Sequence, residues 1–111
     1  MARMPMTKAT VRAMDATQSF LASDEGGNVD VENFVVAGAS KRGWTTWTTA
    51  MVDDRVIAIA PLVIDMLNLE KSFAHHWAAT GQWAPAINDY VNQRVLAWMF
   101  QPEFAAMMDL V

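Results

Sequence analysis

The sequence predicts an α/β fold in residues 1–65, followed by an all-helical segment in residues 66–111. Two apolar runs, Phe34 to Gly38 and Arg55 to Val63, have the length of short buried strands, and the second is rich in Val and Ile. A helix-length segment separates them, which predicts two parallel strands joined by a right-handed crossover. No strand-like run follows Asp65.

The composition is that of a single globular domain, with 53% hydrophobic and 18% charged residues among 111. A net charge of −4 and scattered basic residues argue against a nucleic-acid-binding surface. No apolar run is long enough to span a bilayer, and no secretory leader opens the chain. The absence of cysteine excludes thiolate metal sites and a thiol nucleophile, and we expect neither a metal nor a cofactor.

The residues before the first strand predict a surface helix that packs on the sheet. Thr7 or Thr10 is expected to cap it, and the apolar spacing continues to about Ala22. The acidic, glycine-containing stretch 23–30 predicts a solvated loop, because its acids lack the spacing of a calcium-binding loop.

The segment between the two strands is ambiguous, because its four threonines favour a strand on β-propensity alone. We predict a helix over Trp44 to Val52. Trp44, Trp47 and Met51 have helical spacing, and a helix carries the chain back across the sheet.

Three helices are expected after Asp65. The first starts near Met66 and ends at Gly81, the second begins at Pro85 and extends to Trp98, and the third begins at Pro102.

The candidate site lies at the end of the first strand, where Gly38 and Gly43 bracket a tight turn into the following helix. A serine at such a turn is exposed at the carboxyl edge of the sheet. This arrangement is that of a nucleophile elbow, which makes Ser40 a candidate nucleophile and the backbone N–H of Lys41 a candidate oxyanion donor.

Three other interpretations of this turn stay open. The glycine spacing is that of a phosphate-binding loop with Thr45 in its last place, but Trp44 replaces the lysine that would pair with phosphate. Residues 37–41 are similar to the opening of a short-chain dehydrogenase cofactor loop, but Arg42 and Trp44 stand where that loop needs glycine. The third is an ordinary strand-to-helix turn with an incidental serine.

Asp65 follows the second strand, at the edge where open α/β sheets carry functional groups. It is a candidate catalytic acid, with a cap for the next helix as the alternative. His75 and His76 point about 100° apart on a helix, which disfavours a shared metal. One of them is a candidate base for Ser40, with packing beside Trp77 as the alternative.

Two further groups of side chains have open roles. Lys41 and Arg42 either favour substrates that carry a carboxylate or form a solvated pair. The tryptophans of the helical segment either line a substrate pocket or pack as core or lid residues: Trp77, Trp83 and Trp98.

These motifs also carry a family resemblance. The residues concerned are Pro5 to Lys8, Val11 to Ala16, Gly38 to Trp47, Ala58 to Pro61, Val63 to Asp65, His76, Trp77, Trp83 to Pro85, Asp89 and Tyr90. The chain resembles the PhoPQ-activated pathogenicity-related family, which includes the autocrine proliferation repressor proteins. That family is similar to α/β-hydrolases of the esterase and dipeptidyl-peptidase kind, and its members are several times longer than this chain.

The resemblance implies that the chain is an internal fragment of a serine hydrolase, inactive alone, in which Ser40 is the nucleophile. The helices after Asp65 would be an insertion over the site. The motif around Ser40 is also similar to that of glucuronoyl esterases, whose acid can follow the next strand, and this favours Asp65 as an acid. The implied partners are an ester or peptide substrate and the missing remainder of the hydrolase domain.

Several expected parts of a hydrolase are absent from the chain, including the loop that supplies the second oxyanion donor and the usual acid and histidine. Two alternative functions therefore stay open, a non-catalytic binding or signalling protein on a hydrolase-like scaffold and a nucleotide-binding module. Relatives are often exported, but the compartment stays open because the chain carries no leader.

Overall fold

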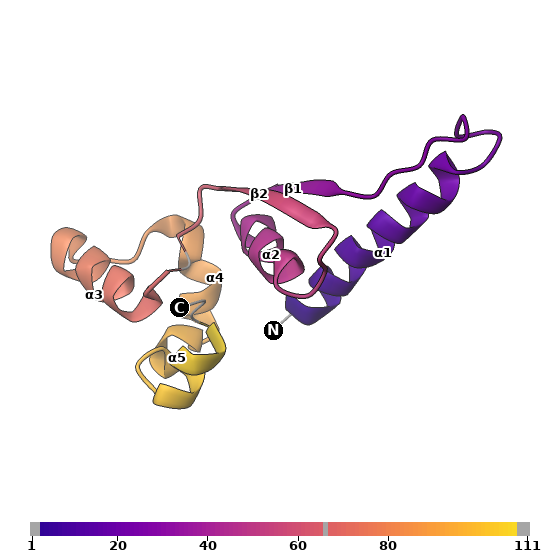
Figure 1. Cartoon of the computed structure of the whole chain (residues 1–111). Coiled ribbons are helices and arrows are strands. Elements are labelled where there is room, and N and C mark those ends of the chain that lie inside the picture. The colour runs from indigo at the N-terminus through magenta and orange to yellow at the C-terminus, as the bar shows by residue number, and fades with distance from the viewer. Residues whose placement is uncertain (1–2, 66, 109–111) are drawn as a thin grey trace. The chain divides into compact units, whose positions relative to one another are not determined.

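The computed structural model describes residues 3–65 and 67–108, which fall into two units that divide between Ile64 and Asp65 (Figure 1). None of the helices in residues 3–65 and 67–108 combines the length and the hydrophobicity that a membrane span requires.

The first unit consists of α1 (Arg3–Leu21), β1 (Phe34–Ala39), α2 (Lys41–Ala50) and β2 (Val56–Leu62). The strands pair in parallel, with a register shift after Phe34. The predicted order of strand, helix and strand is confirmed, and so is the parallel pairing.

The threonine-rich segment is helical because its hydroxyl groups are satisfied within the helix. Thr45 Oγ1 donates to the Lys41 carbonyl at 3.2 Å, Thr46 Oγ1 to the Gly43 carbonyl and Thr49 Oγ1 to the Thr45 carbonyl, the last two at 2.7 Å. Thr46 and Thr49 are 1% and 0% exposed. These bonds remove the cost of burying the hydroxyls, so packing outweighs the β-propensity of threonine.

Helix α2 covers one face of the two-stranded sheet and contacts both strands (Figure 1). The opposite face is open, since alternate side chains of both strands are exposed on it: Val35, Ala37, Ala58, Ala60 and Leu62. Val35 and Leu62 are 66% and 55% exposed. The prediction that the second strand is buried on both faces is wrong here, because α2 covers one side of it only.

Helix α1 packs mainly against α2, so the prediction that it packs on the sheet is wrong. Thr7 and Met14 are buried, and the hydroxyls of Thr7 and Thr48 share a hydrogen bond of 2.7 Å. The predicted caps are wrong as well, since α1 already begins at Arg3 and places Thr7 and Thr10 inside the helix.

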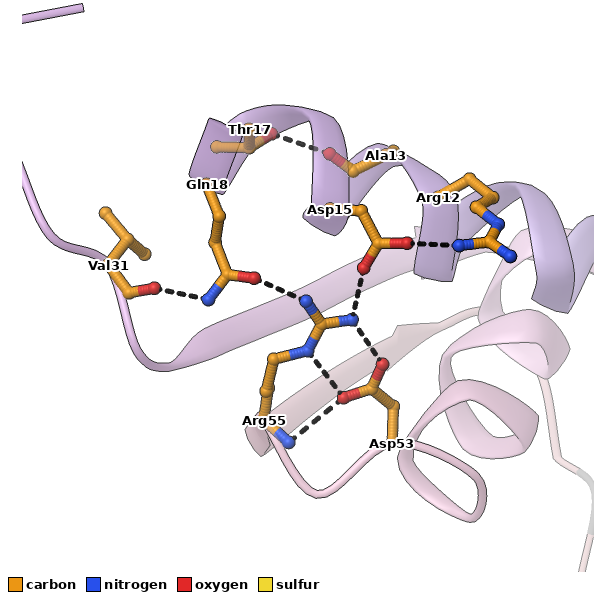
Figure 2. Close-up of polar contacts among 8 residues, drawn as sticks. All are labelled: Arg12, Ala13, Asp15, Thr17, Gln18, Val31, Asp53 and Arg55. Atoms are coloured by element: carbon orange, nitrogen blue, oxygen red, sulfur yellow. Dashed lines mark hydrogen bonds and ion pairs between the residues drawn. The ribbon is translucent and has the colours of Figure 1, made fainter. Parts of the chain in front are cut away.

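Arg55, the residue just before β2, connects α1 to the rest of this unit through hydrogen bonds and ion pairs (Figure 2). Arg55 Nη2 lies 2.8 Å from Asp15 Oδ1 on α1 and 2.6 Å from Asp53 Oδ2, and its Nε donates to Asp53 Oδ1 at 2.9 Å. Arg55 also donates to the side chain of Gln18, whose amide in turn donates to the Val31 carbonyl. The network thus joins α1, the segment before β1 and the start of β2.

These contacts lower the pKa of both carboxyl groups. The pKa of Asp15 lies below its ordinary value because Arg12 and then Arg55 donate hydrogen bonds to it. The pKa of Asp53 is lowered by the hydrogen bonds from Arg55. A carboxyl group with a lowered pKa stabilises the fold at neutral pH, and that contribution is lost as the pH falls through the folded-state pKa.

The second unit contains α3 (Leu69–Thr80), the 3-10 turn η1 (Pro85–Ile87), α4 (Asn88–Asn92), the 3-10 turn η2 (Val95–Trp98) and α5 (Pro102–Met108). As predicted, α3 ends at Gly81, which has a φ of 67° and donates its N–H to the Trp77 carbonyl at 2.8 Å. The continuous helix predicted from Pro85 to Trp98 is wrong. Arg94 has a φ of 55°, and a left-handed residue interrupts the helical hydrogen-bond series.

Three rings of the second unit, those of Phe73, His76 and Trp77, lie around Trp83. The ring centroid of Trp83 lies 5.8 Å from that of Phe73, 5.9 Å from that of His76 and 4.9 Å from that of Trp77. Trp77 and Trp83 therefore contact each other, but Trp77 is 47% exposed and Trp98 is 62% exposed, so the prediction of core packing is wrong for these two.

We predict that Arg55→Ala lowers the melting temperature of the chain at pH 7 more than Arg12→Ala does. Arg55 joins two carboxylates and a glutamine, whereas Arg12 is exposed and, among the described residues, forms an ion pair with Asp15 only. The difference between wild type and Arg55→Ala should shrink as the pH falls below the ordinary carboxyl pKa of 3.8. Equal effects of the two variants in a thermal melt would contradict this role of Arg55.

Candidate active site

Ser40 stands alone between β1, which ends at Ala39, and α2, which begins at Lys41. Its φ of 54° and ψ of −123° are values that residues with a Cβ atom rarely adopt. Its N–H donates to the Leu62 carbonyl at 2.9 Å, and its carbonyl accepts from the Trp44 N–H at 3.1 Å. The residue is therefore fixed on one side by β2 and on the other by α2, while its surface is exposed.

Two glycines let the first turn of α2 approach the end of β1. A Cβ atom on Gly38 would lie 2.6 Å from the Arg42 carbonyl oxygen. A Cβ atom on Gly43 would lie 2.9 Å from the Gly38 carbonyl oxygen and 2.4 Å from the Ile64 Cγ2 atom. Because both overlaps involve backbone atoms, only glycine permits this close contact.

The two residues after Ser40 are cationic and exposed. Lys41 and Arg42 form the start of α2, and its first turn contains no acidic residue. Lys41 is the residue whose N–H follows the candidate nucleophile, and its carbonyl accepts a hydrogen bond from Thr45 within the helix. The carboxyl edge of β1 therefore presents a serine hydroxyl beside the positive end of a helix dipole and two positive side chains.

Asp65 belongs to the second unit, and its carboxylate is engaged there. Its Oδ1 accepts from the Leu67 N–H at 3.1 Å, and its Oδ2 accepts from the Ser72 hydroxyl at 3.3 Å. Helix α3 has Asn68 as its N-cap, so the predicted cap by Asp65 is wrong. The two bonds hold the carboxylate of Asp65 beside the segment that leads into α3.

His76 is held by contacts within the second unit. Its Nε2 accepts a hydrogen bond from the Ala84 N–H at 3.2 Å, and its ring stacks on Trp83 with an interplanar angle of 10°. A general base needs a ring nitrogen with an available lone pair. In the neutral ring the Nε2 lone pair is used for Ala84, which favours the packing role over that of a base for Ser40.

No group of three or more potential metal-ligating side chains occurs in residues 3–65 and 67–108. Sequence reasoning missed Leu62 and Ile64 as partners of the turn. The pairing of β2 with β1 brings both residues to the turn, and this pairing connects segments distant in sequence. It also missed the network around Arg55, although the spacing of Asp53 and Arg55 was a usable signal.

The first unit thus presents an exposed serine at the carboxyl edge of a parallel sheet, and sequence comparison gives the class of protein that carries it. Residues 1–111 match the family described as PhoPQ-activated pathogenicity-related protein, and the chain belongs to this family. The family resemblance noted in the sequence is therefore confirmed.

A relative in Dictyostelium discoideum is named autocrine proliferation repressor protein A. The two are 49% identical over 112 residues, a match that covers 98% of this chain and 22% of the relative. The chain thus spans about a fifth of the length of that protein. No solved structure matches the chain.

We predict that Ser40→Gly is more stable than Ser40→Ala by about 1–2 kcal/mol, because both variants lack the hydroxyl and only glycine relieves the backbone strain at a positive φ. Chemical denaturation of the two variants gives the difference. Equal stabilities, or a more stable alanine variant, would contradict the strained conformation of residue 40.

Proposed function

We propose that the chain is part of a longer serine hydrolase in which Ser40 is the nucleophile of ester or peptide cleavage. The observation that carries the proposal is the exposed Ser40, held with a φ of 54° between a parallel strand and the start of a helix. Backbone strain at an exposed hydroxyl is typical of a nucleophile elbow.

In the proposed reaction, Ser40 Oγ attacks the carbonyl carbon of the substrate while a general base takes the hydroxyl proton. The backbone N–H of Lys41 and the positive end of α2 stabilise the oxyanion that forms. The base returns the proton to the leaving alcohol or amine as the bond to carbon breaks. Water then cleaves the acyl-enzyme, which releases the acid and restores Ser40.

We place the base, the usual acid and the second oxyanion donor outside this chain. His76 uses its Nε2 for a backbone N–H, and the relative is several times longer than the chain. Asp65 stays a candidate acid in this proposal, although its carboxylate accepts hydrogen bonds from the Leu67 N–H and the Ser72 hydroxyl.

The open face of the sheet supports a larger α/β-hydrolase core in the complete protein. Strands at the centre of such a sheet are covered on both faces, and here one face leaves apolar side chains in solvent. Val35 and Leu62 on that face are each more than half exposed. We further propose that residues 66–111 are a helical insertion in that core.

The proposal is tested with the longest polypeptide that the gene encodes and with 4-nitrophenyl acetate as substrate. Ser40→Ala should lower kcat by about a thousandfold or more, as loss of a nucleophile does in other serine hydrolases. Ser19→Ala, an exposed serine on α1, is the matched control and should keep wild-type kcat.

A fluorophosphonate probe should label Ser40 in the same polypeptide, with the labelled peptide identified by mass spectrometry. Labelling at another serine, or full activity in the folded Ser40→Ala variant, would exclude the proposed nucleophile.

A second candidate is a non-catalytic binding or signalling function on the same scaffold. It is favoured by the name of the relative, which describes repression of proliferation and no reaction. In that case Ser40→Ala should repress cell proliferation as strongly as the wild-type protein. If repression instead depends on catalysis, the hydrolase proposal expects Ser40→Ala to lose it.

A further inference from the structure

We propose that the hydrogen bond between His76 and Ala84 is a pH-sensitive switch in the second unit. The bond holds Ala84, and with it the η1 turn, beside α3 while the His76 ring is neutral, and it is lost when the ring gains a proton. The inference rests on contacts within the second unit and does not depend on the proposed hydrolase function.

The direction of this hydrogen bond fixes the protonation state of the ring. The backbone N–H of Ala84 can only donate, so His76 Nε2, which lies 3.2 Å from the Ala84 nitrogen, is the acceptor. The ring is then neutral and carries its proton on Nδ1. In a protonated ring both nitrogens are donors, and the Nε2–H group would face the N–H of Ala84. The bond is therefore incompatible with a charged His76.

The residues before Ala84 have other contacts with α3, so release begins at Ala84. Gln82 accepts a hydrogen bond from the Thr80 hydroxyl at 2.8 Å, and the ring of Trp83 lies against those of Phe73 and Trp77 as well as that of His76. For the N–H of Ala84, His76 is the partner that the described part of the chain supplies. Loss of this bond frees the backbone from Ala84 into η1.

Protonation also adds an attraction, which is smaller than the loss. A charged ring stacked on Trp83, with an interplanar angle of 10°, gains a cation–π contact, and such contacts are weak where water reaches the site. His76, Trp83 and Ala84 are all half-buried. The opposing cost combines a lost hydrogen bond, an unsatisfied N–H and two donors that face each other. The balance therefore favours release of Ala84 in acid.

In the described residues, no carboxylate lies at ion-pair distance from His76 to hold a charged ring in place. Residues 82–87 contain no ionisable side chain, and α5, which contacts α3, carries Glu103. The other ionisable side chains of α3 are more than one turn away or point about 100° from His76: Glu70, Lys71 and His75. Because histidine changes charge between about pH 8 and about pH 5, the bond should be lost over that range.

The experiment measures amide hydrogen exchange of residues 84–87 by mass spectrometry in the longest polypeptide that the gene encodes. The quantity compared is the protection factor, which is the exchange rate of the unfolded chain divided by that of the folded protein at the same pH. From about pH 8 to about pH 5 it should fall about fivefold to tenfold in wild type, the effect of losing one hydrogen bond.

Two variants remove the switch from opposite sides. His76→Gln cannot change charge, so its protection factor should be the same at both pH values. Ala84→Pro removes the donor, and the Ala84 φ of −60° and ψ of 140° suit proline, so this variant should show the low acid value at both pH values. His75→Gln is the matched control, because His75 is exposed on the same helix, and it should keep the wild-type fall.

Three results would overturn the inference. They are an equal protection factor at both pH values in wild type, a wild-type fall that persists in either His76→Gln or Ala84→Pro, and a fall that disappears in His75→Gln. Activity towards esters has no part in this test, so its outcome is separate from that of the proposed nucleophile.

Discussion

The strained backbone of Ser40 is the constraint on which the first unit depends. A residue with a φ of 54° persists because hydrogen bonds on both sides hold it, one to the Leu62 carbonyl and one from the Trp44 N–H. The first bond requires β2 beside β1, and the second requires the first turn of α2. Gly38 and Gly43 are needed because that turn lies against the strand without room for a Cβ atom.

Helix α2 has a second role as the centre of packing in this unit. Its buried side, with Trp44, Thr46 and Thr49, holds it against both strands, and α1 lies on it in turn. Arg55 joins α1 to the start of β2 through Asp15. The residue that carries the proposed chemistry is thus exposed, while the elements that fix its backbone are held by buried and ionic contacts.

Much of this arrangement follows from the sequence. The two apolar runs and their glycines predict the parallel pair and the turn at Ser40, and the helical spacing of Trp44 and Trp47 outweighs the β-propensity of threonine. The covering layers were not predictable, because the face that a helix or strand buries depends on neighbours distant in sequence. The left-handed residue Arg94 has no local signature either, since glycine and asparagine are the usual residues there.

The site is predictable only in part, for a related physical reason. Sequence reasoning identifies Ser40 and the alternative roles of Asp65 and His76, but it does not give the hydrogen bonds that distinguish those roles. The hydrolase and nucleotide-binding interpretations both stay predictions. They differ in what the turn must present, an exposed hydroxyl in one case and room for a phosphate in the other.

The central claim is the conformation of residue 40, and an experimental structure of the chain, by crystallography or NMR, tests it most directly. The account predicts a φ near 54° with the Ser40 hydroxyl facing solvent and the Leu62 carbonyl bound to its N–H. A negative φ, or a hydroxyl turned inward and hydrogen-bonded to α2, would contradict it.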